Sequence, residues 1–424
     1  MSWPPAFPIL SLLVWAPAAG ALLSALPREE LTGLRRRISL GFAAATLVLA
    51  VALTFHVGPG EHLRELRRWI PTLGFSYDLS LDAYRVLLTF WIALLGLLAL
   101  VSAPSGRRAT LLVLLAETAL LGLATAGDGA LFLAFYGALI LALAILLERG
   151  EAMRTFFFFQ SAGLALAFCY VAIVYHLTWV QTGFPSAEIA RFSSLVTFPD
   201  FERRMFLLGA SVFAFAAPLF PFTSWVASAG FSLSNPGRLM LFGGFPLASA
   251  SFFVRAVVPS YTGGEGALVA LAVLSLLYAG LASRRSWAAL LVGCQGLVAL
   301  ALLSGVAGRA GVLPMALALS ALALWTSEPD DAPGAIPGGL ALLMFLPTAW
   351  LVLRERWSAA PLTTAFAGLG FVLMMFHLAR SLPPLSRRRA VLLLPVVGLW
   401  AISFLAPSRF AAGDAKVDAV QEEE

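Results

Sequence analysis

The chain has 424 residues, of which 60% are hydrophobic and 12% are charged, and its mean hydropathy is +0.88. Soluble domains carry roughly 25% charged residues, so this composition excludes a water-soluble fold. The net charge of +5 comes from short arginine clusters between apolar segments, a pattern typical of membrane topology signals and not of nucleic-acid binding.

Fourteen apolar stretches, each long enough to cross roughly 30 Å of hydrocarbon, follow one another along the chain. The first has no basic region before it, so we predict a retained helix and not a cleaved signal peptide. Because backbone polar groups in lipid must pair within their own segment, all fourteen are predicted to be helices. The predicted spans are residues 5–26, 38–57, 84–103, 109–126, 129–147, 155–178, 206–227, 237–258, 267–283, 286–305, 309–325, 336–352, 361–380 and 388–406.

The predicted fold class is therefore all-α, a polytopic membrane protein of about 14 transmembrane helices. One helical domain covers residues 1–408, and the acidic residues 409–424 are predicted to form a disordered tail. Cytoplasmic loops carry an excess of arginine and lysine, so the arginine-rich loops after odd-numbered spans place both termini on the outer side of a bacterial inner membrane. The loop arginines are Arg28, Arg35, Arg36, Arg37, Arg107, Arg108, Arg149, Arg154, Arg238, Arg284, Arg285, Arg387, Arg388 and Arg389.

Residues 61–72, EHLRELRRWIPT, separate apolar and basic side chains at helical spacing. Leu63, Leu66 and Trp69 fall on one helical face, and the arginines fall on the other. Amphipathic helices with basic residues opposite an apolar face lie in the membrane interface. We predict a short interfacial helix here, acting as a local anchor or lid.

Few ionisable side chains are predicted to lie within the hydrocarbon: Glu117 near the middle of the fourth span, His176 late in the sixth and His377 late in the thirteenth. A lone carboxylate at mid-membrane is costly, so an ion path through Glu117 is one hypothesis. A neutral Glu117 that only hydrogen-bonds a neighbouring helix is the other. The histidines fit either an ion path or the membrane interface, and Gln160 is expected to form an interhelical hydrogen bond.

The seventh span contains Pro218 and Pro221, three residues apart. Each proline removes a backbone donor and crowds the preceding turn, so the helix is predicted to break there, with Trp225 just beyond the hinge. In transporters, a broken helix at mid-membrane marks the ion or substrate site. A kink that only shapes packing is the alternative interpretation.

Side-chain catalysis, a metal and a cofactor are not expected of this chain. Cys169 and Cys294 each lie in an apolar run, so they form neither a disulfide framework nor a CxxC metal site. The sequence also lacks a phosphate-binding glycine loop, a Ser/His/Asp constellation and an HExxH pattern. Its only lysine is Lys416, in the tail.

Four stretches are informative together: PILSLLVWAPAAGALL at residues 8–23, WIPTLGFSYDLSLDAYRVLLTFWIALL at 69–95, GDGALFLAFYGALI at 127–140, and PLFPFTSW at 218–225, followed by SNPGRLML and the pair Arg255 and Pro259. They resemble the antiporter-like subunits of respiratory complex I, of the chain M type. That family is shared with multisubunit sodium/proton antiporters and membrane-bound hydrogenases. The family-like core covers about residues 109–305, and beyond it the resemblance rests on helix count. The resemblance also makes Asp128, which leads into the fifth helix, an ion-path candidate.

The resemblance implies a proton pathway with a glutamate on the fifth helix, lysines on the seventh and eighth helices, and a histidine after PLFPF. In this sequence those positions hold Gly137, Ala216, a residue near Leu247, and Thr223. Moving the match to the family by a few residues places a lysine at none of these positions, because no predicted span contains a lysine.

The leading functional hypothesis is an antiporter-like membrane subunit of a complex I-related assembly of the NADH-quinone oxidoreductase type, structural or coupling, with impaired or no proton translocation of its own. Its partners would be other membrane subunits and the bilayer, and the electron-transfer chemistry would belong to those partners. A second hypothesis keeps proton or sodium translocation through Glu117 and charges donated by partners. A third places the chain in an inorganic-carbon uptake or hydrogenase-type complex.

Overall fold

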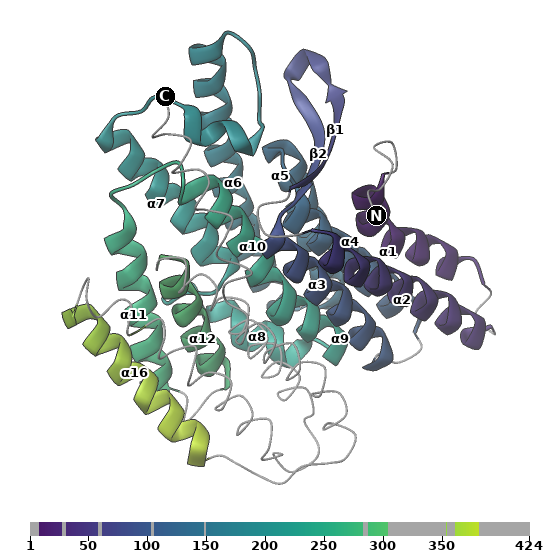
Figure 1. Ribbon diagram of the computed structural model, residues 1–424. Helices are drawn as coiled ribbons and strands as arrows, with labels where there is room; N and C mark the ends of the chain where they lie inside the picture. The colour runs from purple at the N-terminus through teal and green to yellow at the C-terminus, as the bar shows by residue number, and fades with distance from the viewer. Residues whose placement is uncertain are drawn as a thin grey trace.

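Helices dominate the computed structural model of this chain (Figure 1). The predicted spans 309–325, 336–352 and 388–406, and the predicted acidic tail, lie outside the residues that it describes. Those residues are 8–27, 31–57, 62–102, 106–147, 150–282, 287–303, 353 and 361–380.

The described helices follow the predicted spans in order along the chain. Seven helical segments in this part are long and apolar enough to cross a membrane. The chain is therefore a mostly helical membrane protein, and the total of fourteen spans stays a prediction. The helices are α1 (Ile9–Ala25), α2 (Thr32–His56), α3 (Ala83–Ser102), α4 (Arg107–Thr125), α5 (Gly129–Leu146), α6 (Glu151–Thr182), α7 (Pro199–Ala216), α8 (Ser224–Ser232), α9 (Asn235–Arg238), α10 (Phe245–Phe252), α11 (Glu265–Ala282), α12 (Trp287–Leu302) and α16 (Pro361–Arg380).

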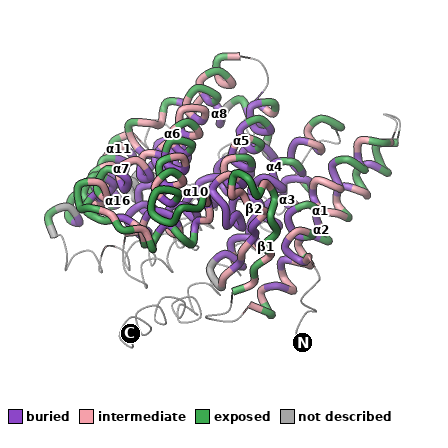
Figure 2. The backbone as a smooth tube through the Cα atoms, turned by 90° about the horizontal axis from the view of Figure 1, so that it is seen from above, coloured by how far each residue is buried: buried purple, intermediate pink, exposed green. Residues whose placement is uncertain are grey.

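Glycine allows neighbouring helices to approach closely. A side-chain carbon at Gly20 of α1 would overlap Phe42 of α2, and one at Gly370 of α16 would meet the backbone of Leu276 in α11. Close approach gives membrane helices the van der Waals contact that holds them together in lipid. Figure 2 shows buried residues gathered in the middle of the bundle, with α1 and α2 at one edge.

The eighth span is one helix with two widened segments. α9 continues into η3 (Leu239–Gly244), α10 and η4 (Phe253–Val257), and both η segments have π-helical hydrogen bonding. Pro246 follows η3 and supplies no backbone donor, so the α-helical pattern is interrupted at that point. This span is also the most buried of the seven candidates, which makes it the centre of the described bundle.

The prediction of an interfacial helix at residues 61–72 is wrong, because this segment forms one arm of a β-hairpin. β1 (Leu63–Ile70) pairs antiparallel with β2 (Phe75–Leu81). The short η1 (Pro71–Leu73) joins them through Gly74, whose φ of 65° suits glycine. In β2, FSYDLSL, apolar and polar residues alternate with the strand period of two. Strand pairing with β2 therefore outweighs the helical spacing of β1, and the all-α prediction is corrected to mostly helical with one hairpin.

The predicted break of the seventh helix is confirmed. α7 ends at Ala216 and α8 begins at Ser224, so residues 217–223, which include Pro218 and Pro221, leave the helix. α8 then continues in a separate short segment (Figure 1).

Candidate functional site

Neighbouring helices provide hydrogen-bond partners for the break between α7 and α8. Phe220 donates its backbone N–H to Ser275 Oγ of α11 at 2.9 Å. Gln160 of α6 donates its side-chain amide to the Phe215 carbonyl at 3.2 Å, which confirms its expected interhelical bond. Phe220 lies in the break, and the Phe215 carbonyl lies in the last turn of α7, where the helix supplies no donor. Within a bilayer both groups need such protein partners.

Aromatic rings pack around the same break. Phe215 and Phe222 stack with ring centroids 4.4 Å apart, and Phe220 stacks on Tyr278 of α11 at 5.2 Å. Trp225, at the start of α8, is fully buried. These rings pack the break closely, but the buried Trp225 indole N–H has no hydrogen-bond partner among the described residues, and Pro221 is exposed.

The four positions where the family resemblance implies ionisable side chains lie on elements of this central region. Ala216 and Thr223 flank the break, at the end of α7 and the start of α8. Gly137 lies on α5 opposite Leu164 of α6, and Leu247 is buried in α10. None of the four side chains can gain or release a proton in the physiological range.

Tyr136 adds a buried polar group that the sequence analysis did not single out. Its hydroxyl lies beside Gly163 of α6, where a side-chain carbon would approach it to 2.9 Å. Within the described residues, neither the Tyr136 hydroxyl nor Gln160 Oε1 has a hydrogen-bond partner. The available signal was a tyrosine inside an otherwise apolar span, because a buried tyrosine hydroxyl normally needs a partner. Both side chains are uncharged, so they can orient dipoles here but cannot replace the missing charges.

Glu117 is fully buried at the interface between α4 and α3. A side-chain carbon at Gly96 of α3 would overlap the Glu117 carboxyl group, so the carboxyl packs directly on the α3 backbone. Its two oxygens have no hydrogen-bond partner among the residues that the structure describes. A buried carboxyl without a cation or donors is far cheaper to hold as the neutral acid than as the anion. The contact with Gly96 explains how the carboxyl is accommodated, while its part in an ion path stays a prediction.

Asp128 caps the N-terminus of α5 and ties it to the hairpin. Its side chain accepts hydrogen bonds from the Ala130 N–H at 2.8 Å and from the N–H and hydroxyl of Ser76, both at 3.1 Å. Burial raises the pKa of Asp128, and the hydrogen bonds from Ser76 and Ala130 oppose that rise. These contacts give the residue a structural role as a helix cap. Its role in an ion path stays a prediction.

Arg64 of β1 joins the hairpin to the connection between α6 and α7. It donates two hydrogen bonds to Asp78 of β2, at 3.0 and 2.8 Å, and pairs with Glu188, which also accepts one from Arg191 at 2.8 Å. The hydrogen bond to Asp78 raises the pKa of Arg64. Burial alone would raise the pKa of Glu188, but the hydrogen bonds from Arg64 and Arg191 outweigh it and lower that pKa.

Two further arginines extend this network toward the bundle. Arg85 pairs with Asp82 at 2.8 Å, and Arg255 of η4 donates to the Ala126 carbonyl at 2.5 Å and to Ser80 Oγ at 3.4 Å. Burial alone would raise the pKa of Asp82, but the charge of Arg85 and its hydrogen bonds lower it. We call the whole group the hairpin ion cluster: Arg64, Asp78, Asp82, Arg85, Glu188, Arg191 and Arg255.

The ion-path candidates from the sequence are not brought together. His176 is exposed on the surface of α6, while Asp128 lies at the edge of the hairpin and Glu117 lies between α3 and α4. Across the described ranges, no hydrogen bond or ion pair joins any two of these three side chains. His377 falls in α16, and its side chain is outside the described residues. A relay through these candidates would therefore need groups from elsewhere.

Comparison with known proteins finds similarity in fold. No family profile matches the sequence, and no curated protein is similar to it by sequence. Among solved structures, a chain of respiratory complex I from Thermus thermophilus with bound NADH matches with a TM-score of 0.80 and 21% identity, covering 95% of this chain and 98% of that one.

Two other membrane assemblies contain similar chains. One belongs to the membrane-bound sulfane sulfur reductase, an archaeal respiratory membrane complex, with a TM-score of 0.75 and 18% identity over 93% of this chain and 75% of that one. The other belongs to the Mrp complex from Dietzia sp. DQ12-45-1b, with a TM-score of 0.79 and 18% identity. That match covers 96% of this chain and 52% of the Mrp chain, so the protein spans about half the length of the Mrp chain. The fold is therefore shared with membrane chains of multisubunit complexes.

Proposed function

We propose that this chain is an antiporter-like membrane subunit of a respiratory assembly of the complex I or Mrp type, and that it has a structural or coupling role without translocating protons by itself. The three chains compared above each belong to a multisubunit membrane complex, which supports the assignment as a subunit. The proposal includes that the chain is of the chain M type and that it lies in a bacterial inner membrane. Electron transfer and its cofactors would belong to other subunits.

The observation that carries the proposal is that four positions where the family resemblance implies charged or titratable side chains hold uncharged residues, within a fold found in such complexes. Ala216 and Thr223 flank the broken helix, Gly137 and Leu247 lie on neighbouring elements, and aromatic rings pack around the break. Proton translocation requires titratable groups at mid-membrane with polar partners that move their pKa values. In the described part of the bundle, Glu117 could serve as such a titratable group. Its carboxyl packs against Gly96 and has no hydrogen-bond partner among the described residues.

Purification in a mild detergent tests the assignment as a subunit. The full chain, tagged at its N-terminus and expressed at its natural level, is expected to co-purify with other membrane proteins in a fixed ratio. Identification of those companions by mass spectrometry separates the hypotheses, since complex I-type subunits support the proposal. A large zinc-site protein as the main companion would instead favour the inorganic-carbon uptake reading. A chain that purifies alone under conditions that keep other respiratory complexes intact would contradict the proposal.

A flux assay tests the absence of translocation. Vesicles containing the purified chain alone are expected to show the same proton and sodium flux as empty vesicles, and Glu117→Gln is expected to leave that flux unchanged. Glu151→Gln, at the exposed start of α6, is the matched control for loss of one carboxylate. A flux that the wild-type chain supports and that only Glu117→Gln removes would establish the transport hypothesis in its place.

A further inference from the structure

The two π-helical segments of the eighth span each accept a hydrogen bond from an aromatic side chain of another helix. Trp91 of α3 donates its indole N–H to the Gly243 carbonyl of η3 at 3.1 Å. Tyr170 of α6 donates its hydroxyl to the Ala256 carbonyl of η4 at 2.6 Å. Both aromatic side chains are fully buried, so each bond forms away from competing water, where a hydrogen bond is stronger.

A π-helical turn sets the direction of the side chains around it. In η4 the Val258 N–H reaches back five residues to the Phe253 carbonyl, at 3.1 Å, whereas an α-helix reaches back four. Such turns are rare and occur frequently at functional sites. Moving the widened turn by one step along the helix would rotate a residue by about 100°, the angle between successive residues of an α-helix. Side-chain directions in η4 therefore depend on what holds this turn in place.

Arg255 lies in η4, and its guanidinium reaches the base of the hairpin. It donates to the Ala126 carbonyl at 2.5 Å and to Ser80 Oγ of β2 at 3.4 Å. Ala126 forms a β-bridge with β2, and the next residue, Gly127, donates its N–H to the Asp78 carbonyl at 2.7 Å. Arg255 therefore bonds both sides of the junction between β2 and the connection from α4 to α5.

Aromatic rings on both sides of η4 fix the position of Tyr170. Its ring makes edge contacts with Phe252, just before η4, at a centroid distance of 5.8 Å, and with Tyr261, shortly after η4, at 6.1 Å. The same helix, α6, carries Gln160, which donates to the Phe215 carbonyl beside the break in the seventh helix. α6 therefore connects that break with the π-helical turn of the eighth span.

From these contacts we propose that Tyr170 is a positioning residue, which holds η4 in its π-helical form and so directs Arg255 at the junction between β2 and the α4–α5 connection. The contacts form a continuous route from the break, through α6 and η4, to the hairpin. This route gives the coupling role proposed above a path through the chain, and in that respect the inference rests on the proposed function. A movement of α6 at the break would displace the Ala256 carbonyl and Arg255 with it.

Hydrogen exchange at the Gly127 amide, measured by mass spectrometry on the purified full chain in lipid nanodiscs, tests the proposal. Tyr170→Phe keeps the ring and removes only the hydroxyl that bonds Ala256. This variant is expected to speed exchange at Gly127 about tenfold, because a misdirected Arg255 loses a charge-assisted hydrogen bond to the junction and the junction then opens locally. A wild-type exchange rate in Tyr170→Phe would overturn the proposal.

A double-mutant comparison separates positioning from general loosening. If Tyr170 acts through Arg255, then adding Tyr170→Phe to Arg255→Gln is expected to leave exchange at Gly127 as it is in Arg255→Gln alone. A further increase, as large as in the wild-type background, would show that Tyr170 acts independently of Arg255 and would overturn the proposal. Arg255→Lys supports the same comparison if Arg255→Gln does not fold, since lysine keeps the charge but lacks the fork of donors.

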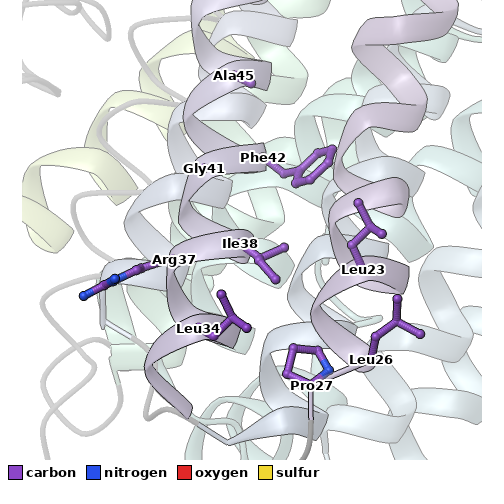
Figure 3. A pocket seen from close by; sticks show the side chains of 9 residues that line it. All are labelled: Leu23, Leu26, Pro27, Leu34, Arg37, Ile38, Gly41, Phe42 and Ala45. Carbon is purple, nitrogen blue, oxygen red and sulfur yellow. The ribbon is translucent and has the colours of Figure 1, made fainter. Parts of the chain in front are cut away.

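Two control variants are expected to keep the wild-type exchange rate at Gly127. Trp91→Phe removes the corresponding hydrogen bond at η3, a segment without a charged residue. Gly41→Ala lies far from the route, in the open groove between α1 and α2 (Figure 3), where an added side-chain carbon meets no atom within 4 Å. An equal effect of Trp91→Phe and Tyr170→Phe would contradict a specific role of Tyr170. Because exchange is measured without partner subunits or ion flux, that result would leave the assignment as a subunit standing.

Discussion

Replacing Ala216 by lysine is expected to lower the free energy of unfolding by about 3 kcal/mol more than replacing it by methionine. Ala216 is fully buried at the end of α7, roughly 15 Å along the helix from residue 206, where the predicted span begins. That depth is half of the roughly 30 Å hydrocarbon. Lysine and methionine have similar lengths, so the comparison isolates the amine from the cost of overpacking.

The measurement is reversible unfolding of the purified chain in bicelles by titration with a denaturing detergent. An equal cost for lysine and methionine would mean that water reaches position 216. In that case the centre of the protein would be hydrated, and the argument against translocation would lose its main support. The same comparison at Leu247, which is also buried, is expected to give a penalty of the same sign.

Replacing Arg64 by alanine is expected to cost about 2 to 3 kcal/mol of stability and to loosen the hairpin. Asp78 is 2% exposed and would lose two hydrogen bonds, while Glu188 would retain only Arg191. Removal of one partner of a buried ion pair typically costs about 3 to 5 kcal/mol, and the lower figure reflects the partly exposed Arg64. Arg67→Ala, at an exposed position of the same strand, is expected to change stability by less than about 0.5 kcal/mol.

Limited proteolysis at the hairpin, alongside the unfolding measurement, checks this expectation at several pH values. Against the opposing effect of burial, hydrogen bonds from Arg64 and Arg191 lower the pKa of Glu188 in the folded chain, so the stabilisation from Glu188 is complete above the ordinary carboxyl pKa of about 4 and is lost as the pH falls through the lowered value. Burial raises the pKa of Asp128 in the folded chain, so the contribution of Asp128 to stability falls as the pH rises through the raised value. The difference between wild type and Arg64→Ala is therefore expected to shrink from pH 7 to pH 3. A difference that stays constant with pH would show that the cost of Arg64→Ala is not electrostatic.

The hairpin shows where sequence reasoning was insufficient. The spacing of Leu63, Leu66 and Trp69 fits a helix as well as a strand, and only the alternation in residues 75–81 gives β1 a partner. Once paired, Glu65 of β1 accepts a hydrogen bond from the Leu10 N–H at 2.6 Å and so caps the start of α1. That cap links residues 55 positions apart in the chain, which no local pattern can predict.

Glu117 shows the same limit at the candidate site. Its depth in the fourth span follows from the sequence, because hydrophobic length alone places it near mid-membrane. Its contact with Gly96 and the absence of a partner within the described part of the chain follow from the packing of α3 on α4. Whether a buried carboxyl serves transport depends on those neighbours, and they come from another helix.

By itself the sequence determined that this is a helical membrane protein, that its seventh helix breaks at Pro218 and Pro221, and that lysine is missing from its predicted spans. These properties are local: hydrocarbon selects apolar helices, and proline lacks a donor wherever it stands. The tertiary structure decided the hairpin and its ion cluster. Each depends on residues that meet only after folding, as Arg64 and Glu188 do across 124 positions of the chain.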